Sequence, residues 1–549
     1  MQRLVLLMLF LFCFGSLHAQ QTEPKKYLVY LSDKNNTPYT IQQPAQFLSE
    51  KAIARRQRQQ ISVTTRDLPV NPAYVQTIKG TGVEVWYTSR WFNAVVVRGT
   101  AEQLAQVNAL SFVKNSRSLN RISSPSATNG TLAVKNSSGT SSEALNTMLA
   151  PGDYGLAYHQ ANMLGATELH DAGFHGEGMT IAVLDAGFPG VNTIPAFAHL
   201  YQNNQVIGTF DFVTRTENVY GANAHGTSVL STMAAYLPGK MIGTAYKANY
   251  LLLRTEDAPT EHNIEEVNWL IAAEYADSAG ADVINSSLGY TVFDAPSVSY
   301  SYEQMDGNTT IVARAADFAA ATGILVVTSA GNDGNKTWKY ISSPADADSV
   351  LTVGAVDSLG VVASFSSRGP TADGRIKPDV VALGANAYVL NSAGNLVKSN
   401  GTSFSGPIMA GFATTLWQAN LSKTNYEIIQ LIHRLGSKAS APDNTLGYGI
   451  PNYSRIVTGL PTLGAEEGVA LVNPVTGNDL IILLADNWRI QLTELQIIDA
   501  TGKLILKKML QPDQERQTID LQALALQKGV YLCRFISGNQ IATIRFVKL

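Results

Sequence analysis

The feature that most constrains the fold is an apolar run that ends in a carboxylate. Residues 179–184 read Met-Thr-Ile-Ala-Val-Leu, and Asp185, Ala186 and Gly187 follow directly. This run lacks the alternation of a half-buried strand and is typical of a strand buried on both faces in a parallel sheet. Open α/β sheets place their sites at the carboxyl ends of such strands. The pattern therefore predicts an α/β core with Asp185 at its functional edge.

The region around this strand alternates predicted strands with predicted helices. Further strands are expected near residues 282 and 324 and at 250–254 and 350–356, and helices at 265–278 and 310–322. This βα alternation predicts a mostly parallel sheet flanked by helices, over residues 151–458. With 549 residues, 45% hydrophobic and 15% charged, the chain is globular and too long for one core.

A histidine stands at the predicted start of a helix. His225 opens the run His-Gly-Thr-Ser-Val, and an apolar helical pattern continues from it. A lone histidine is most often a surface loop residue, as a lone Asp is most often a cap. Small residues, however, surround this one, as is needed where backbones and a substrate approach closely: Ala222, Ala224, Gly226 and Thr227.

A serine stands at a similar position. Ser403 lies in Asn-Gly-Thr-Ser-Phe-Ser-Gly-Pro, residues 400–407, which predicts a turn followed at once by a helix. The free N–H groups of a helix start stabilise negative charge that develops beside such a hydroxyl. Gly-Thr-Ser is also an ordinary helix cap, so the motif gains its meaning from the two that precede it.

Together the three motifs closely resemble those of the subtilase family of serine peptidases, in the same chain order of Asp, His and Ser. The resemblance covers about residues 150–458. It implies that Ser403 is the nucleophile, His225 its general base and Asp185 the group that orients the imidazole. Two departures bear on specificity rather than on the triad: Phe404-Ser405 replaces the commoner Met-Ala, and Ser228 stands where many members carry a second histidine.

The resemblance also assigns two substrate-contacting segments. Asn332 follows a buried strand in a Gly-rich turn, and it matches the side chain that completes the oxyanion hole with the backbone N–H of Ser403. Ser287, Leu288 and Gly289 match the stretch that lines the S1 pocket and hydrogen-bonds the substrate as an added strand. The alternatives are an ordinary turn asparagine and a plain strand-to-loop turn.

The first residues indicate export. Residues 1–19 combine Arg3, an apolar stretch at 4–14 and a small-residue cleavage site at Ala19, and so predict a signal peptide. A membrane anchor is the alternative, but the stretch is short for one. Of the two cysteines, Cys13 lies in this leader and Cys533 remains alone, which excludes an internal disulfide, as is usual in bacterial extracellular enzymes.

Residues 25–120 predict a small α+β unit. Strands are expected at 27–31, 83–87, 92–97 and 112–114, and helices at 44–59, 71–79 and 101–110. The unit is similar to the leader of bacterial subtilases that carry Arg-Arg after a Phe-Leu-Ser helix, which implies an inhibitor-like propeptide; an unrelated accessory domain is the alternative. A basic cluster on the first helix is expected to be its solvated face: Lys51, Arg55, Arg56 and Arg58. Residues 121–150, rich in Ser, Asn and Thr, predict a flexible linker with the maturation site.

The C-terminal part differs in pattern. After a linker at 459–470, short predicted strands separated by turns indicate a small all-β sandwich over 471–549. Its motifs include Asn473-Pro474, Asp499-Ala-Thr-Gly-Lys503 and Gly529-Val-Tyr-Leu532, and they resemble the type A C-terminal sorting domain of type IX secretion. An Ig-like or carbohydrate-binding domain is the alternative.

These observations predict a serine endopeptidase secreted to a bacterial cell surface, which cleaves polypeptides through an acyl-enzyme. The expected partners are polypeptide substrates, its own propeptide and the type IX secretion machinery. No transmembrane segment is expected in the mature protein, and a net charge of −3 gives no case for nucleic acid. No cofactor is expected, although structural calcium is common in subtilases and has no recognisable sequence signature here.

Two other functions are alternatives to this prediction. A catalytically silent surface binding protein on the same frame would need no intact triad. The three triad residues and Asn332 are nevertheless all present. A hydrolase of esters or lipids would be expected to carry Gly-x-Ser-x-Gly with the serine first in chain order, which is not the order found.

Overall fold

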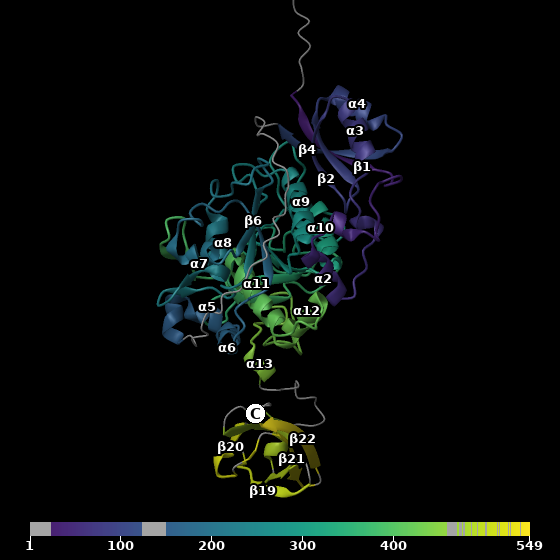
Figure 1. The fold of residues 1–549 in the computed structure, drawn as a ribbon. Coiled ribbons are helices and arrows are strands. Elements are labelled where there is room, and N and C mark those ends of the chain that lie inside the picture. The colour runs from purple at the N-terminus through teal and green to yellow at the C-terminus, as the bar shows by residue number, and fades with distance from the viewer. Residues whose placement is uncertain are drawn as a thin grey trace, which may run out of the picture.

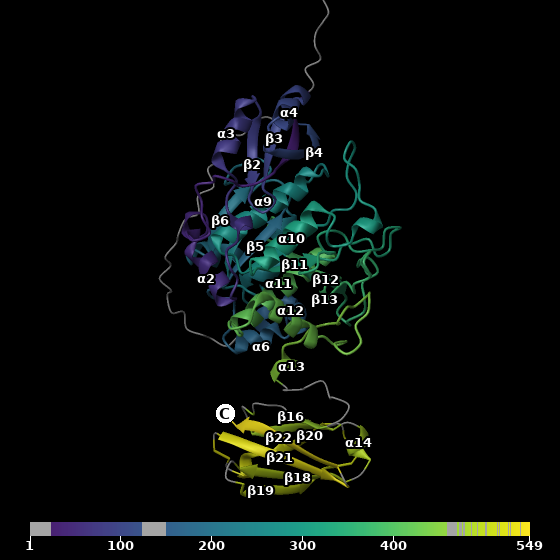
Figure 2. The same cartoon turned by 90° about the vertical axis from the view of Figure 1, so that its right-hand side faces the viewer.

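The computed structural model describes residues 23–122, 150–457 and most of 469–548 (Figure 1). The predicted signal peptide, nearly all of the linker at 121–150 and most of that at 459–470 lie outside the described residues. The described residues form an N-terminal unit, a central unit and a C-terminal unit, and the last of these is drawn apart from the other two in both views (Figure 2).

Seven parallel strands form the central sheet, in the order β13-β12-β11-β10-β5-β9-β6. Their bounds are β5 Thr180–Asp185, β6 Val206–Asp211, β9 Asn249–Arg254, β10 Val283–Ser286, β11 Leu325–Ser329, β12 Leu351–Val356 and β13 Val380–Leu383. Every residue of β5, β10, β11 and β12 is buried. The prediction of strands covered on both faces is therefore confirmed.

Helices cover the two faces of this sheet. Ile181 and Val183 of β5 pack in one core cluster with α8 (His225–Ala234) and α11 (Thr402–Gln418). Ala182 and Leu184, which point the other way, pack in a second cluster with α9 (Ile264–Ala279) and α10 (Ile311–Ala321). The period of two along the strand thus separates the two cores.

Smaller elements complete this unit. The helices are α5 Tyr158–Asn162, α6 Ala166–Asp171, α7 Ala198–Gln202, α12 Asn425–Arg434 and α13 Ser454–Val457. Two hairpins pair β7 Tyr236–Leu237 with β8 Met241–Ile242 and β14 Ala387–Leu390 with β15 Leu396–Ser399.

The N-terminal unit is a four-stranded antiparallel sheet in the order β2-β3-β1-β4. Its elements are β1 Lys25–Leu31, β2 Glu84–Ser89, β3 Ala94–Gly99, β4 Val113–Ile122, α3 Pro72–Gly80 and α4 Ala101–Asn108. Val95 and Val97 pack in a small core with α3 and α4, whereas Ala94 and Val96 belong to the same cluster as α9 and α10. This unit is therefore docked on two helices of the central unit.

One expectation for this unit is wrong. The helix predicted at 44–59 is a short 3₁₀ turn, Pro44–Gln46, followed by α2 (Glu50–Arg58). Its basic cluster is not a solvated face, because Arg55 and Arg56 are only 1% and 2% exposed. Their acidic partner is Asp277 on α9, which is far away along the chain, so no local pattern could reveal it.

The C-terminal unit is a β-sandwich with a core of its own. Two antiparallel sheets, β16-β17-β20 and β19-β18-β21-β22, enclose a cluster that includes Leu480, Ile497 and Phe535. The strands are β16 Val469–Leu471, β17 Asp479–Leu484, β18 Glu494–Asp499, β19 Leu504–Met509, β20 Arg516–Asp520, β21 Gly529–Ser537 and β22 Gln540–Lys548, with one short helix, α14 Asp486–Arg489. The predicted sandwich is confirmed. None of the helices in the described ranges combines the length and the apolar character that a bilayer crossing requires.

Because α11 is buried along its length, its large side chains should dominate the stability of the central unit. Phe412 is 0% exposed, and Phe412→Ala should lower the free energy of unfolding by about 3–5 kcal/mol. Tyr426→Ala, at a 63% exposed position on α12, should change it by less than about 0.5 kcal/mol. Urea unfolding followed by tryptophan fluorescence measures both, and equal losses would contradict the packing described.

Candidate active site

The carboxyl ends of three neighbouring strands collect most of the predicted site residues. Asp185 is the last residue of β5, Ser287 follows β10 and Asn332 lies just beyond β11. Strand β10 pairs in parallel with β5 on one side and with β11 on the other. Residues far apart in the sequence therefore meet at one edge of the sheet, as the sequence predicts.

Asp185 and His225 form a direct contact. His225 begins α8, and its Nδ1 lies 2.9 Å from Oδ1 and 3.1 Å from Oδ2 of Asp185. Asp185 is 0% exposed, and its Oδ1 also accepts a hydrogen bond from Ala186 N. Burial disfavours protonation of the imidazole, but the charge of Asp185 and its hydrogen bond outweigh this, so the pKa of His225 is raised above 6.5.

Ser403 is the second residue of α11, so its backbone N–H is one of the free donors of the first helical turn. Two hydrogen bonds anchor the backbone around it to the sheet: Ser329 Oγ donates to Thr402 O at 2.8 Å, and Ser287 Oγ donates to Ser403 O at 3.0 Å. The residue after Ser403 is Phe404, and the centroid of its ring lies 6.1 Å from the centroid of the His225 ring. The starts of α11 and α8 are thereby brought together.

Asn332 is held so that its amide N–H₂ is free to donate. Thr402 N and Thr402 Oγ1 both donate to Asn332 Oδ1, at 2.9 and 3.1 Å. Because a backbone N–H can only donate, the atom facing it must be the oxygen, and Nδ2 is left for another acceptor. Thr402 is 0% exposed, whereas Asn332 is exposed. Thr402 was not singled out from the sequence, although it lies in the Gly-Thr-Ser motif.

Ser287, Leu288 and Gly289 continue β10 beyond the sheet. Ser287 is buried, Leu288 is half-buried and Gly289 is exposed. A Cβ at Gly289 would lie 2.2 Å from Ser342 Oγ, so the loop that carries Ser342 approaches this backbone closely and a larger residue would displace the serine hydroxyl. Tyr290 N donates to Ser343 O at 2.7 Å, which holds the end of the segment.

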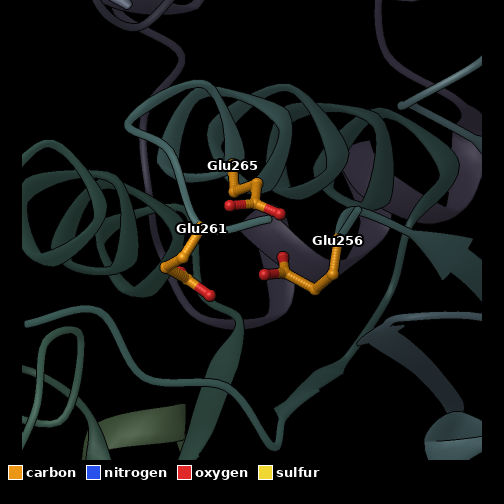
Figure 3. A group of neighbouring side chains, drawn as sticks. All are labelled: Glu256, Glu261 and Glu265. Atoms are coloured by element: carbon orange, nitrogen blue, oxygen red, sulfur yellow. The ribbon is translucent and has the colours of Figure 1, made fainter. Parts of the chain in front are cut away.

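A group of carboxylates lies near this segment and had no recognisable sequence signal. Glu256, Glu261 and Glu265 place carboxylate oxygens within 4.8 Å of one another, and their side chains point toward a common centre (Figure 3). Tyr290 Oη donates to Glu256 Oε1 at 2.6 Å. Burial raises the pKa of Glu256 to about 7 and that of Glu261 to about 8. The loop after β9 meets the first turn of α9 only in the fold, so the spacing alone did not suggest a cluster.

Comparison with known proteins agrees with this geometry. The Subtilase family model matches residues 176–449. The serine protease AprX of Bacillus subtilis is 32% identical in an alignment of 314 positions that covers 52% of this chain and 67% of that protein. A thermophilic serine proteinase of a Bacillus species is 31% identical, over 51% of this chain and 62% of its own length. Subtilisin DY of Bacillus licheniformis is 30% identical, over 52% of this chain and 93% of its own length.

The chain belongs to the subtilase family. The flanking units of this subtilase also match known domains: the Peptidase S8 propeptide domain of Bacteroidota matches residues 26–131, and the secretion system C-terminal sorting domain matches 473–548. The resemblances drawn from the sequence to a propeptide and to a sorting domain are thus confirmed. The sorting domain indicates that this subtilase is secreted or placed at the surface of a bacterium.

The position of Asn332 leads to a kinetic prediction. If Asn332 donates to the oxyanion, as the resemblance implies, Asn332→Ala should lower kcat about 10²–10³-fold and leave KM nearly unchanged, because such an amide serves the transition state rather than the bound substrate. Steady-state kinetics on a chromogenic peptide measure both constants. An equal change in Asn308→Ala, at an exposed loop position, would show that the effect is not specific to the oxyanion position.

The pKa of His225 leads to a second prediction. A general base must be neutral, so kcat/KM should fall as pH drops through a value above 6.5. Glu256 contributes negative charge that raises this pKa, so Glu256→Gln should move the acid limb to lower pH. The matched control is Glu303→Gln at an exposed position, which should leave the limb in place. An unchanged limb in Glu256→Gln would contradict the electrostatic coupling.

Proposed function

We propose that the protein is a serine endopeptidase that hydrolyses peptide bonds through Asp185, His225 and Ser403. The observation that carries the proposal is the 2.9 Å contact of His225 Nδ1 with a fully buried Asp185, beside the helix start that bears Ser403. That contact leaves Nε2 as the basic nitrogen of a neutral imidazole.

The chemistry proceeds by acyl transfer. His225 Nε2 takes the proton of Ser403 Oγ as this oxygen bonds to the substrate carbonyl carbon. Asn332 Nδ2 and the N–H of Ser403 donate hydrogen bonds to the oxyanion, and Asp185 stabilises the imidazolium. The imidazolium then gives its proton to the leaving amine as the C–N bond breaks. Water, deprotonated by His225, hydrolyses the ester and restores Ser403.

The substrate is a polypeptide whose backbone pairs with residues 287–289 as an added strand. Leu288, half-buried at this edge, would line the S1 pocket. The acyl transfer needs no cofactor, because nucleophile, base and oxyanion donors are all supplied by side chains and backbone. The N-terminal unit acts as an inhibitor-like propeptide, and maturation cuts the chain within 121–150, by self-cleavage or by another protease. The C-terminal unit engages the type IX secretion machinery.

The decisive experiment compares the wild type with Ser403→Ala. A fluorophosphonate probe should label the wild type, which should also cleave casein, and the substitution should abolish both. If maturation is autocatalytic, Ser403→Ala should also accumulate precursor, whereas normal processing would assign maturation to a separate protease. A correctly processed wild type that neither reacts nor cleaves would refute the peptidase and favour the binding protein on a subtilase frame.

A further inference from the structure

Helix α2 of the N-terminal unit lies where the strands of the central sheet begin, opposite the catalytic edge at which they end. We call these two ends of the sheet its amino pole and its carboxyl pole. Lys51 Nζ donates to Thr180 Oγ1 at the first residue of β5. Arg55 binds Ala281 O, two residues before β10 begins, and Gln59 Nε2 donates to Gly323 O at 2.7 Å, two residues before β11 begins. Because the strands are parallel, these amino ends are the reverse of the edge that carries Asp185. Figure 1 accordingly draws α2 beside α12, away from the sheet of its own unit.

Three arginines of the N-terminal unit converge there on one carboxylate. Asp277 of α9 is 0% exposed and is paired with Arg55, with Arg56 at 2.8 Å and with Arg90 at 2.5 Å. Desolvation alone would raise the pKa of Asp277, but the three guanidinium groups lower it, so the carboxylate is charged. Arg56 is further held by Asp67 of its own unit, at 2.9 Å.

Other buried groups of the central unit also find their partners in the N-terminal unit. Glu274, 7% exposed on α9, accepts from Ser89 Oγ at 2.5 Å and from Arg90 N at 2.9 Å. Thr322 O, at the end of α10, accepts from Arg55 Nε at 3.2 Å. Release of the N-terminal unit would break all of these contacts together, and Asp277 would lose three cationic partners at once.

An inhibitor-like N-terminal unit is expected to stay bound after the chain is cut. We propose that the rate at which residues 23–122 are then released is set at Asp277 and the arginines around it, rather than at the catalytic edge. The binding surface is anionic and fits the Arg-Arg helix α2. The proposal does not rest on peptidase activity, because it concerns only the fate of the cut chain.

The test uses the full chain with Ser403→Ala and a recognition sequence for a site-specific protease inserted within 123–149. After cutting, gel filtration at low and at 1 M salt should show both fragments in one peak, because buried pairs are little screened. Immediate separation of the fragments would overturn the proposal. Because this variant is inactive by design, the result is independent of the outcome of the probe-labelling experiment.

The role of Asp277 is tested by exchange of the cut complex with a labelled N-terminal fragment. Asp277→Asn should speed release about 30-fold or more. Arg55→Gln makes the complementary change without altering the central unit and should also speed release. The double variant should be little faster than the faster single one, because both remove the same interaction. Release as slow as in the parent for both single variants would refute the assignment to Asp277.

A matched control comes from the same unit. Lys79 is exposed on α3, so Lys79→Gln removes a cation of the N-terminal unit without touching the pole. Its release rate should equal that of the parent. Urea unfolding of each uncut variant shows whether the central unit is folded. If the Asp277→Asn variant does not fold, the release rate of Arg55→Gln decides whether the proposal holds.

Discussion

A seven-stranded parallel sheet buried on both faces is the constraint on which the rest of the molecule depends. Its strands are apolar along nearly their whole length, so charged and polar groups must collect at the strand ends, where the backbone leaves the sheet. The carboxyl ends hold Asp185, Ser287 and Asn332, whereas the amino ends hold Asp282 and the carbonyl groups that α2 contacts. The two ends of one sheet thus carry the candidate active site and the docking surface of the N-terminal unit separately.

At the carboxyl pole, the buried carboxylate of Asp185 is stabilised by hydrogen bonds. A carboxylate that is 0% exposed is costly without hydrogen bonds, and Asp185 has them from Ala186 N and His225 Nδ1. The same contacts fix the imidazole tautomer. Ser403 is anchored in another way, through carbonyl groups on either side of it that accept from serines at the ends of β10 and β11. Ser403 is therefore positioned by backbone anchors, whereas His225 is positioned by its contact with Asp185.

At the other pole, the central unit depends on residues outside itself. Asp277 and Glu274 are buried on α9, and both are paired with groups of the N-terminal unit. The sheet of the N-terminal unit also shares an apolar cluster with α9 and α10. Charge and apolar contact thus act together across one interface, whose charged part lies well away from the reacting groups.

The sequence alone determined the class of fold and the three units, and it predicted the residues of the candidate site. Apolar runs ending in Asp185 and near Asn332 predict strand ends, and helix-start signals at His225 and Ser403 predict where the remaining groups lie, because these are local patterns of hydrophobicity and capping. Only the tertiary structure decided that Arg55 and Arg56 are buried, that Thr402 orients Asn332 and that three glutamates form a cluster. The first two depend on partners distant in the chain, and the third depends on the path of the loop between β9 and α9. Local patterns of hydrophobicity and capping record neither.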